Sequence, residues 1–190
     1  ALVGFPVGFT DRDTGTRCPV RYILRRAKEG QGPSWRVGGC EVSSAEQIRE
    51  KVEEHMKGLG FGFSNEALVV EIVQTEGFDL DITDLPGLKD KTQPDHQRIA
   101  EIVRGYLQDS DCLPVVLCRA PQSHEVAHDL DSLYSLGLDP SRSILVVNFF
   151  NHVFRDFTRV SDLNKYCSGF QGCCDGVFFA QLHIEDCFRQ

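Results

Sequence analysis

The sequence predicts an α/β fold with a largely parallel sheet, and three observations support this prediction. First, strand-like apolar runs alternate along the chain with helical patterns. Second, two of these runs, 113–118 (LPVVLC) and 143–150 (SILVVNFF), are almost continuously apolar, as expected for strands covered on both faces. Third, the 190 residues are 41% hydrophobic and 25% charged, which suits one globular domain or the greater part of one.

The first half of the chain contains a strand, a helix and two further strands. Residues 17–26 alternate apolar and polar positions, which predicts a half-exposed strand with Val20, Tyr22 and Leu24 on one side. Residues 28–34 (KEGQGPS) are expected to form a turn-rich loop. Ser43, followed three residues later by Glu46, predicts a capping box at the start of a helix that ends near Gly58. The expected inward face of this helix consists of Ala45, Ile48, Val52 and Met56.

The remaining elements follow the same alternation. Residues 67–74 and 78–86 are expected to be strands joined by the turn TEG, and residues 94–108 a helix. The two apolar runs described above are separated by a helical pattern near 126–136. An amphipathic stretch at 160–167 and a strand at 177–182 complete the expected order.

Charge and composition exclude several function classes. The formal net charge is −8, which argues against a nucleic-acid partner and against a polybasic surface that would hold an acidic membrane. No apolar run reaches the ~20 residues that a membrane-spanning helix needs. The eight cysteines are expected to be reduced in a cytoplasmic protein, although a zinc site remains an alternative for the group Cys167, Cys173, Cys174 and Cys187.

One candidate site follows a predicted strand directly. Ligands in open α/β sheets bind at the carboxyl ends of strands, and Asp84-Leu-Pro-Gly87 comes directly after the run LDIT. The Asp84 carboxylate can hold a Mg²⁺-bound water, and the Gly87 amide can approach a γ-phosphate because no Cβ is in the way. A plain turn is the alternative interpretation of this segment.

Three segments, in the same order, resemble the dynamin family of large GTPases. Residues 67–90 (ALVVEIVQTEGFDLDITDLPGLKD) are similar to the strand, turn and LTLVDLPG-type strand that lead into the second switch of that family. Residues 14–24 (TGTRCPVRYIL) resemble its first switch, and residues 143–151 (SILVVNFFN) fall where the family has its T-K-x-D motif. The resemblance implies that residues 1–190 are part of a dynamin-type GTPase domain. It also implies a P-loop NTPase-like, mostly parallel sheet with helices on both faces.

The resemblance implies a role for individual residues. Thr16 matches the switch threonine, whose hydroxyl binds Mg²⁺ while the neighbouring backbone helps to place the attacking water. Asp84 and Gly87 match the aspartate and glycine of the second switch, so Thr16 and Gly87 are candidate catalytic residues and Thr16 and Asp84 candidate Mg²⁺ ligands. Asp84, Gly87, Asn148 and Asn151 are the candidate nucleotide-binding residues. GTP is the implied ligand, with self-association and membrane contact through regions outside this chain.

Two departures from the family pattern affect this expectation. No G-x-x-x-x-G-K-[ST] occurs in the sequence, and the chain begins with Ala1, so we expect a piece of a longer protein that lacks the P-loop strand and is inactive alone. Asn148–Asn151 (NFFN) stands in place of T-K-x-D. Asn151 offers guanine one acceptor oxygen in place of two, Phe149 replaces the lysine that packs along the base, and Phe150 is expected in the core. A non-catalytic, GTPase-like interaction module is therefore the second hypothesis.

A third hypothesis is a zinc hydrolase, because residues 124–128 (HEVAH) match the H-E-x-x-H pattern. On a helix, His124 and His128 would share one face and grip Zn²⁺, with Glu125 as general base. The polar surroundings, with Ser123 before the motif and Asp129 after it, are more typical of a helix cap than of a zincin helix.

Overall fold

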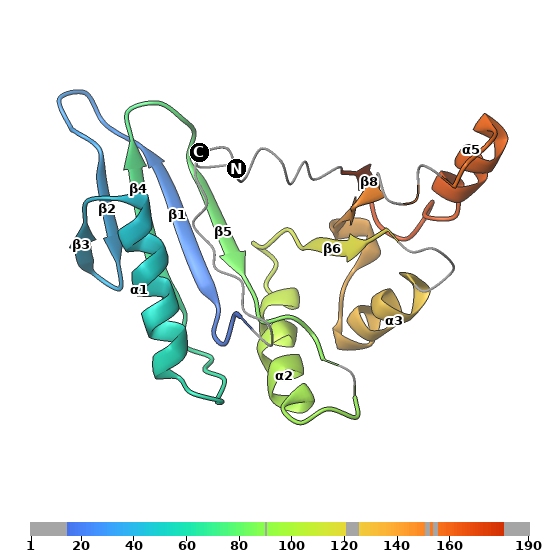
Figure 1. The fold of residues 1–190 in the computed structure, drawn as a ribbon, viewed down its shortest axis with the longest axis horizontal. Helices are drawn as coiled ribbons and strands as arrows, with labels where there is room; N and C mark the ends of the chain where they lie inside the picture. Colours follow the sequence, from blue (N-terminus) through green and yellow to red (C-terminus); the bar gives the residue numbers. More distant parts are fainter. Residues whose placement is uncertain (1–14, 90, 121–125, 151–152, 154–155, 181–190) are drawn as a thin grey trace. The chain divides into compact units, whose positions relative to one another are not determined.

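The computed structural model describes residues 15–89, 91–120, 126–150, 153 and 156–180, with the backbone alone at 126–129. The chain divides into two compact units, Ala1–Val103 and Arg104–Gln190, and each unit is described by itself (Figure 1). Helix α2 (His96–Leu107) begins in the first unit and ends in the second. In the described part of the chain, none of the helices is both long and apolar enough to cross a membrane.

The described residues of the first unit form a five-stranded sheet in the order β3-β2-β4-β1-β5, with helix α1 alongside it (Figure 1). β1 pairs in parallel with β4, whereas its other neighbour, β5, runs antiparallel to it. β2 pairs antiparallel with both β3 and β4. The bounds of these elements are β1 (Val20–Arg26), β2 (Ser34–Val37), β3 (Cys40–Val42), α1 (Ala45–Gly58), β4 (Leu68–Gln74) and β5 (Leu80–Asp84).

The prediction of a mostly parallel sheet is wrong for this unit, and its short connections explain why. Antiparallel neighbours can be joined by a two-residue turn, whereas parallel neighbours need a crossover of a dozen residues or more. Gly38 and Gly39 form such a turn between β2 and β3, with φ angles of 56° and 80° that favour glycine. Neither β2 nor β3 is among the predicted strands, although Gly-Gly is a signal for a hairpin turn. The turn after β4 passes over the end of β1, because β1 lies between β4 and β5.

Helix α1 lies where the sequence predicts, but its N-cap is Ser44 and not the predicted Ser43. The N-cap is Ser44, whose hydroxyl accepts a hydrogen bond from the backbone N–H of Gln47 at 3.2 Å. The Gln47 side chain in turn accepts from the backbone N–H of Ser43 at 2.8 Å. The cap therefore uses Ser44 and Gln47 in place of the predicted Ser43 and Glu46, and the Gln47 side chain bonds to the residue before the N-cap instead of to the N-cap itself.

The core of the first unit lies between α1 and one face of the sheet. The alternation predicted for β1 is confirmed, since Val20, Tyr22 and Leu24 are buried and Arg21 and Arg25 are exposed. Burying one large apolar side chain contributes about 1.5–3 kcal/mol, so this face is the main source of the unit's stability. The buried residues that α1 and β4 contribute are Ile48, Val52, Met56, Leu68, Val70 and Ile72.

The described residues of the second unit form a parallel sheet in the order β6-β7-β8, as the sequence predicts. β6 is not covered on both faces, because Val115 and Leu117 are 54% and 72% exposed whereas Val116 and Cys118 pack against the core. The bounds of the elements are β6 (Val115–Arg119), α3 (Val126–Leu136), η1 (Pro140–Arg142), β7 (Ile144–Asn148), α5 (Val160–Ser168) and β8 (Gly176–Phe179).

Aromatic rings fill much of the second core. Phe150 lies 5.0 Å from Phe179 and 6.1 Å from Tyr166, measured between ring centroids. Phe170 contacts both Tyr166 and Phe179 edge-on, which is a favoured geometry for aromatic pairs. Phe150 therefore belongs to the core as predicted, but the prediction that the apolar strand continues to residue 150 is wrong, because β7 ends at Asn148.

Candidate nucleotide-binding site

The predicted residues Thr16 and Asp84 lie together in the structure. β1 and β5 are antiparallel, and Val20 at the start of β1 is paired with Asp84 at the end of β5. The chain just before Val20 therefore passes the carboxyl end of β5. There the Thr16 hydroxyl donates a hydrogen bond of 2.9 Å to Oδ2 of Asp84. Two residues 68 positions apart in the sequence thus form one polar site.

A pair of arginines holds β5 against β1 beside this site. Asp81, three residues before Asp84, accepts hydrogen bonds of 2.5 Å from Arg25 and 2.6 Å from Arg21. These bonds, from Arg25 first and then Arg21, hold the pKa of the Asp81 carboxyl below its ordinary value. Because all three side chains are partly or largely exposed, these ion pairs between β1 and β5 contribute little to stability.

The surrounding protein changes the acidity of Asp84. The pKa of its carboxyl is raised above the ordinary value, chiefly because nearby protein reduces the hydration of the carboxyl, although Asp84 as a whole residue is exposed. The hydrogen bond from Thr16 acts in the opposite direction. Burial raises the pKa of nearby Tyr22 to about 12, with a smaller contribution from the negative charge of Asp84. A cation bound at Asp84 would relieve this unfavourable charge.

The atoms at this site suit Mg²⁺. Magnesium prefers oxygen ligands and often keeps several waters, so that a protein supplies only a few direct contacts. Thr16 offers a hydroxyl oxygen whose lone pairs are not used by the bond it donates to Asp84, and Asp84 offers a carboxylate. This donor set fits a magnesium ion held by the hydroxyl and, through water, by the carboxylate.

Gly87 lies three residues beyond Asp84 and is exposed. A Cβ built at this position meets no atom within 4 Å, so nothing in the described protein requires glycine there. The space that a side chain would occupy at Gly87 is therefore open, and the binding of a phosphate by its amide stays a prediction.

Replacing Asp84 by Asn is expected to change how stability depends on pH. The raised pKa means that the native state holds this proton more tightly than the unfolded chain, whose ordinary value is 3.8. The contribution that Asp84 makes to wild-type stability should therefore be lost as the pH rises from below 3.8 through the higher native pKa. Asp84→Asn removes this loss and keeps an acceptor for Thr16, so the variant should gain stability relative to wild type above this pH window. Urea titrations of both proteins between pH 3 and pH 7 measure the difference. A difference that does not change with pH, or that changes in the other direction, contradicts the prediction.

Asn148, the first residue of the candidate base-reading segment, belongs to the second unit. It ends β7, and its side-chain oxygen accepts a hydrogen bond of 2.8 Å from the backbone N–H of Phe149. Phe149 has a φ angle of 57°, an unusual conformation for a residue with a Cβ, and the Arg119 guanidinium lies 5.5 Å from its ring centroid. Asn151 lies outside the described residues, so its role stays a prediction.

The alternative zinc sites are only partly covered by the structure. His124 and Glu125 of HEVAH lie outside the described residues, and of His128 the structure describes the backbone alone, at the start of α3. Cys187 is also outside the described residues. Among the residues that are described, no three or more His, Cys, Asp or Glu side chains come together in a way that could hold a metal ion.

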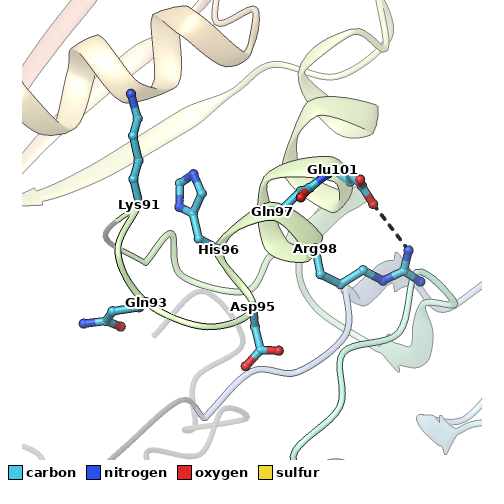
Figure 2. A pocket seen from close by; sticks show the side chains of 7 residues that line it. All are labelled: Lys91, Gln93, Asp95, His96, Gln97, Arg98 and Glu101. Atoms are coloured by element: carbon cyan, nitrogen blue, oxygen red, sulfur yellow. Dashed lines mark ion pairs between the residues drawn. The ribbon is translucent and has the colours of Figure 1, made fainter.

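A polar cavity of about 590 Å³ lies at the start of α2 (Figure 2). In Figure 2, Lys91 and His96 extend in one direction from the loop and Asp95 in the other, while Arg98 and Glu101 form an ion pair of 3.6 Å. Thr16, Asp84 and Gly87 do not line this cavity, so it is separate from the predicted site.

The side chains that surround the loops of the site are not among the residues predicted from the sequence. Arg17 and Lys89 follow Thr16 and Gly87 by one and two residues, and both lie near the ring of Phe63. His96 contacts the backbone of the second of these loops. Two features of the sequence could have drawn attention to these side chains. A basic residue follows each switch-like motif closely, and the segment 60–63 (GFGF) is unusual.

Comparison with known families identifies the family of this chain. The family model described as the dynamin family matches residues 1–150. The chain belongs to the dynamin family, and the region with Thr16, Asp84 and Gly87 lies within the match.

Curated relatives give the same assignment over shorter stretches. The chain is 31% identical over 103 residues to the interferon-induced GTP-binding protein Mx of Epinephelus coioides, covering 49% of this chain and 16% of that protein. It is 27% identical over 114 residues to Mx1 of Oncorhynchus mykiss, with 54% and 18% covered. Dynamin-like protein A of Dictyostelium discoideum is 29% identical over 129 residues, with 67% and 14% covered. The matched regions thus span less than a fifth of each of these relatives.

Proposed function

We propose that the full-length protein containing this chain binds GTP and hydrolyses it with Mg²⁺. The observation that carries the proposal is the hydrogen bond of 2.9 Å between Thr16 and Asp84. It brings a hydroxyl and a carboxylate, the oxygen ligands of a magnesium–nucleotide site, together at the end of β5. Membership of the dynamin family, and relatives named as GTP-binding proteins, support the nucleotide.

The proposed roles follow from the chemistry of each group. Phosphoryl transfer depends mainly on positioning and on stabilising negative charge. Thr16 would hold the metal through its hydroxyl, and the backbone beside it would orient the attacking water. Asp84 would accept a hydrogen bond from a metal-bound water, and the Gly87 amide would donate one to the terminal phosphate. When bound, Mg²⁺ neutralises charge on the phosphates.

The remaining parts of the machinery belong to the full-length protein. These 190 residues contain no G-x-x-x-x-G-K-[ST], so the phosphate-binding loop and the strand before it are proposed to come from outside them. Self-association, membrane remodelling through other regions and a cytoplasmic location complete the proposal, by similarity to the family.

The test is GTP hydrolysis by the purified full-length protein. Phosphate release should require Mg²⁺ and should stop when EDTA removes the metal. Full-length protein that is folded and binds GTP, yet releases no phosphate above the uncatalysed rate, would contradict the proposal. That result would favour the second hypothesis, a GTPase-like interaction module.

The segment 148–151 (NFFN) is the specific observation that favours such a module. The side-chain oxygen of Asn148 accepts a hydrogen bond from the backbone N–H of Phe149, and Phe149 stands where the family has a lysine. A stably folded full-length protein with no affinity for nucleotide would also favour this second hypothesis, because the absence of GTP hydrolysis is what defines the module.

Guanine preference in the full-length protein is expected to be weaker than usual for the family. If Asn151 occupies the base-reading position, its amide would place a donor against a guanine N–H. Such a mismatch costs roughly 1–3 kcal/mol, or about one to two decades of preference. Asn151→Asp should therefore tighten GTP binding and leave ATP and XTP binding unchanged or weaker.

Competitive binding of GTP, ATP and XTP to wild type and to Asn151→Asp measures this effect. Asn164→Asp is a suitable control, because it adds the same charge at an exposed position of α5 that is not among the candidate nucleotide-binding residues. A wild-type protein that already prefers GTP by several orders of magnitude would show that other residues read the base.

A further inference from the structure

The ring of Phe63 lies beside a cation from each of the two loops of the proposed site. The Arg17 guanidinium carbon is 5.9 Å from the ring centroid, and the Lys89 ammonium nitrogen is 5.5 Å from it. Both distances are within the range of a cation–π interaction. Arg17 directly follows Thr16, and Lys89 lies two residues after Gly87. One half-buried ring therefore contacts both segments that are proposed to bind nucleotide.

The backbone on both sides of this ring is held in place. The N–H of Ser64 donates 3.0 Å to the carbonyl of Arg17, and the N–H of Leu68 donates 2.8 Å to the carbonyl of Pro19. The segment that carries Phe63 is thus tied to the chain just after Thr16. A further bond of 3.0 Å from the N–H of Gly62 to the carbonyl of Leu59 closes the turn before Phe63.

Lys89 is fixed in turn from the other direction. Nδ1 of His96, at the start of α2, lies 2.7 Å from the carbonyl oxygen of Lys89. Because a carbonyl can only accept, Nδ1 is the donor in this bond. The contacts form a continuous path from Thr16 and Arg17, through Phe63 and Lys89, to His96.

The geometry points to Phe63 as a positioning residue that couples the Thr16 loop to the Gly87 loop. Two cations near one another repel, and the negative face of an aromatic ring offsets that repulsion for both. Displacing either loop would cost its cation–π contact and would alter the field that the other cation feels. This inference rests on the proposed function for its consequence, which is that binding at one loop orders the other.

Hydrogen exchange in the 190-residue chain tests the coupling without any nucleotide. Arg17→Met should increase amide exchange about two- to fivefold in the Gly87 loop, to which the ring of Phe63 links Arg17 in addition to the neighbouring Thr16–Asp84 hydrogen bond. Lys89→Met should increase exchange near Thr16 by a similar factor. Phe63→Leu should increase amide exchange in both loops, whereas Phe63→Tyr, which retains the ring, should exchange at the wild-type rate.

Phe61→Leu is the matched control. Phe61 is 89% exposed, lies two residues from Phe63, and has Arg17 at 6.0 Å from its ring centroid. It should leave the Gly87 loop unchanged. Effects of Arg17→Met and Lys89→Met that stay within the mutated loop would overturn the coupling, even if Phe63→Leu unfolds the chain.

Turnover by the full-length protein separates this inference from the proposed function. In a protein that hydrolyses GTP, Phe63→Leu should lower kcat by about two- to fivefold, while KM stays within a factor of two. A change in KM alone would contradict a positioning role. If wild type does not hydrolyse GTP, the proposed function fails, but the exchange experiment still decides whether Phe63 couples the loops.

Discussion

The 190-residue chain on its own is expected to bind GTP only weakly, with a Kd above about 100 μM. Thr16 and Asp84 can contribute ligands for Mg²⁺, but the described residues do not include the lysine and amide cradle that normally hold the β- and γ-phosphates. A site that grips the metal alone must still order a flexible triphosphate, and few contacts are available to offset that entropy. Titration with a fluorescent GTP analogue measures the affinity directly.

The same titration of the full-length protein tests whether the missing phosphate-binding loop is the cause of the weak binding. The full-length protein should bind GTP at least about a hundredfold more tightly, a difference of roughly 2.7 kcal/mol. Micromolar binding by the 190-residue chain, about −8 kcal/mol, would show that phosphate recognition does not need the loop. Repeating the titration with Asp84→Asn would then show whether the tight site is the one described above.

The sequence correctly predicted those elements that bury one face against a single core. β1 and α1 each present one apolar stripe, and Val20, Tyr22, Ile48 and Val52 are buried as expected. β2 and β3 were missed because they are short, and β3 is at the edge of the sheet with largely exposed side chains. Their signal lies in the turn, Gly38-Gly39, and not in an apolar period.

Strand direction was harder to predict than strand position. The period of the apolar residues identifies which face of a strand is buried, but it does not show which other strand pairs with that strand or in which direction. β1 lies between β4 and β5, although β4 and β5 are adjacent in the sequence. The chain alternates strands and helices in its second half, where the parallel prediction is confirmed, but has successive strands in its first half, where it is wrong.

Only part of the candidate site could be predicted from the sequence. Thr16 and Asp84 were each found through a resemblance to a motif, and the antiparallel pairing of β1 with β5 explains why they meet. The contacts of Phe63 were not predicted, because a cation after each switch-like motif and the segment 60–63 do not by themselves show that residues 17, 63 and 89 meet in the fold. Asn151, His124 and Glu125 lie outside the described residues and stay predictions.

Thr16→Ala is expected to reduce GTP hydrolysis by the full-length protein by about a hundredfold or more. The substitution removes the hydroxyl proposed to bind Mg²⁺, and losing one charge-stabilising contact in an active site typically has an effect of this size. The same change removes the hydrogen bond to Asp84, so the carboxylate loses a contact that favours its charged form. Single-turnover measurements at saturating GTP and Mg²⁺ give the rate of the chemical step.

Thr16→Ser is the matched control, because it keeps the hydroxyl and removes one methyl group. It should retain activity within about tenfold of wild type, since serine can bind the metal and donate to Asp84 in the same way. Raising the Mg²⁺ concentration should partly restore Thr16→Ala if metal affinity is what was lost. An alanine variant that turns over GTP at the wild-type rate would show that Thr16 does not hold the metal. The hydrogen bond of 2.9 Å to Asp84 would then be a structural contact between the start of β1 and the end of β5.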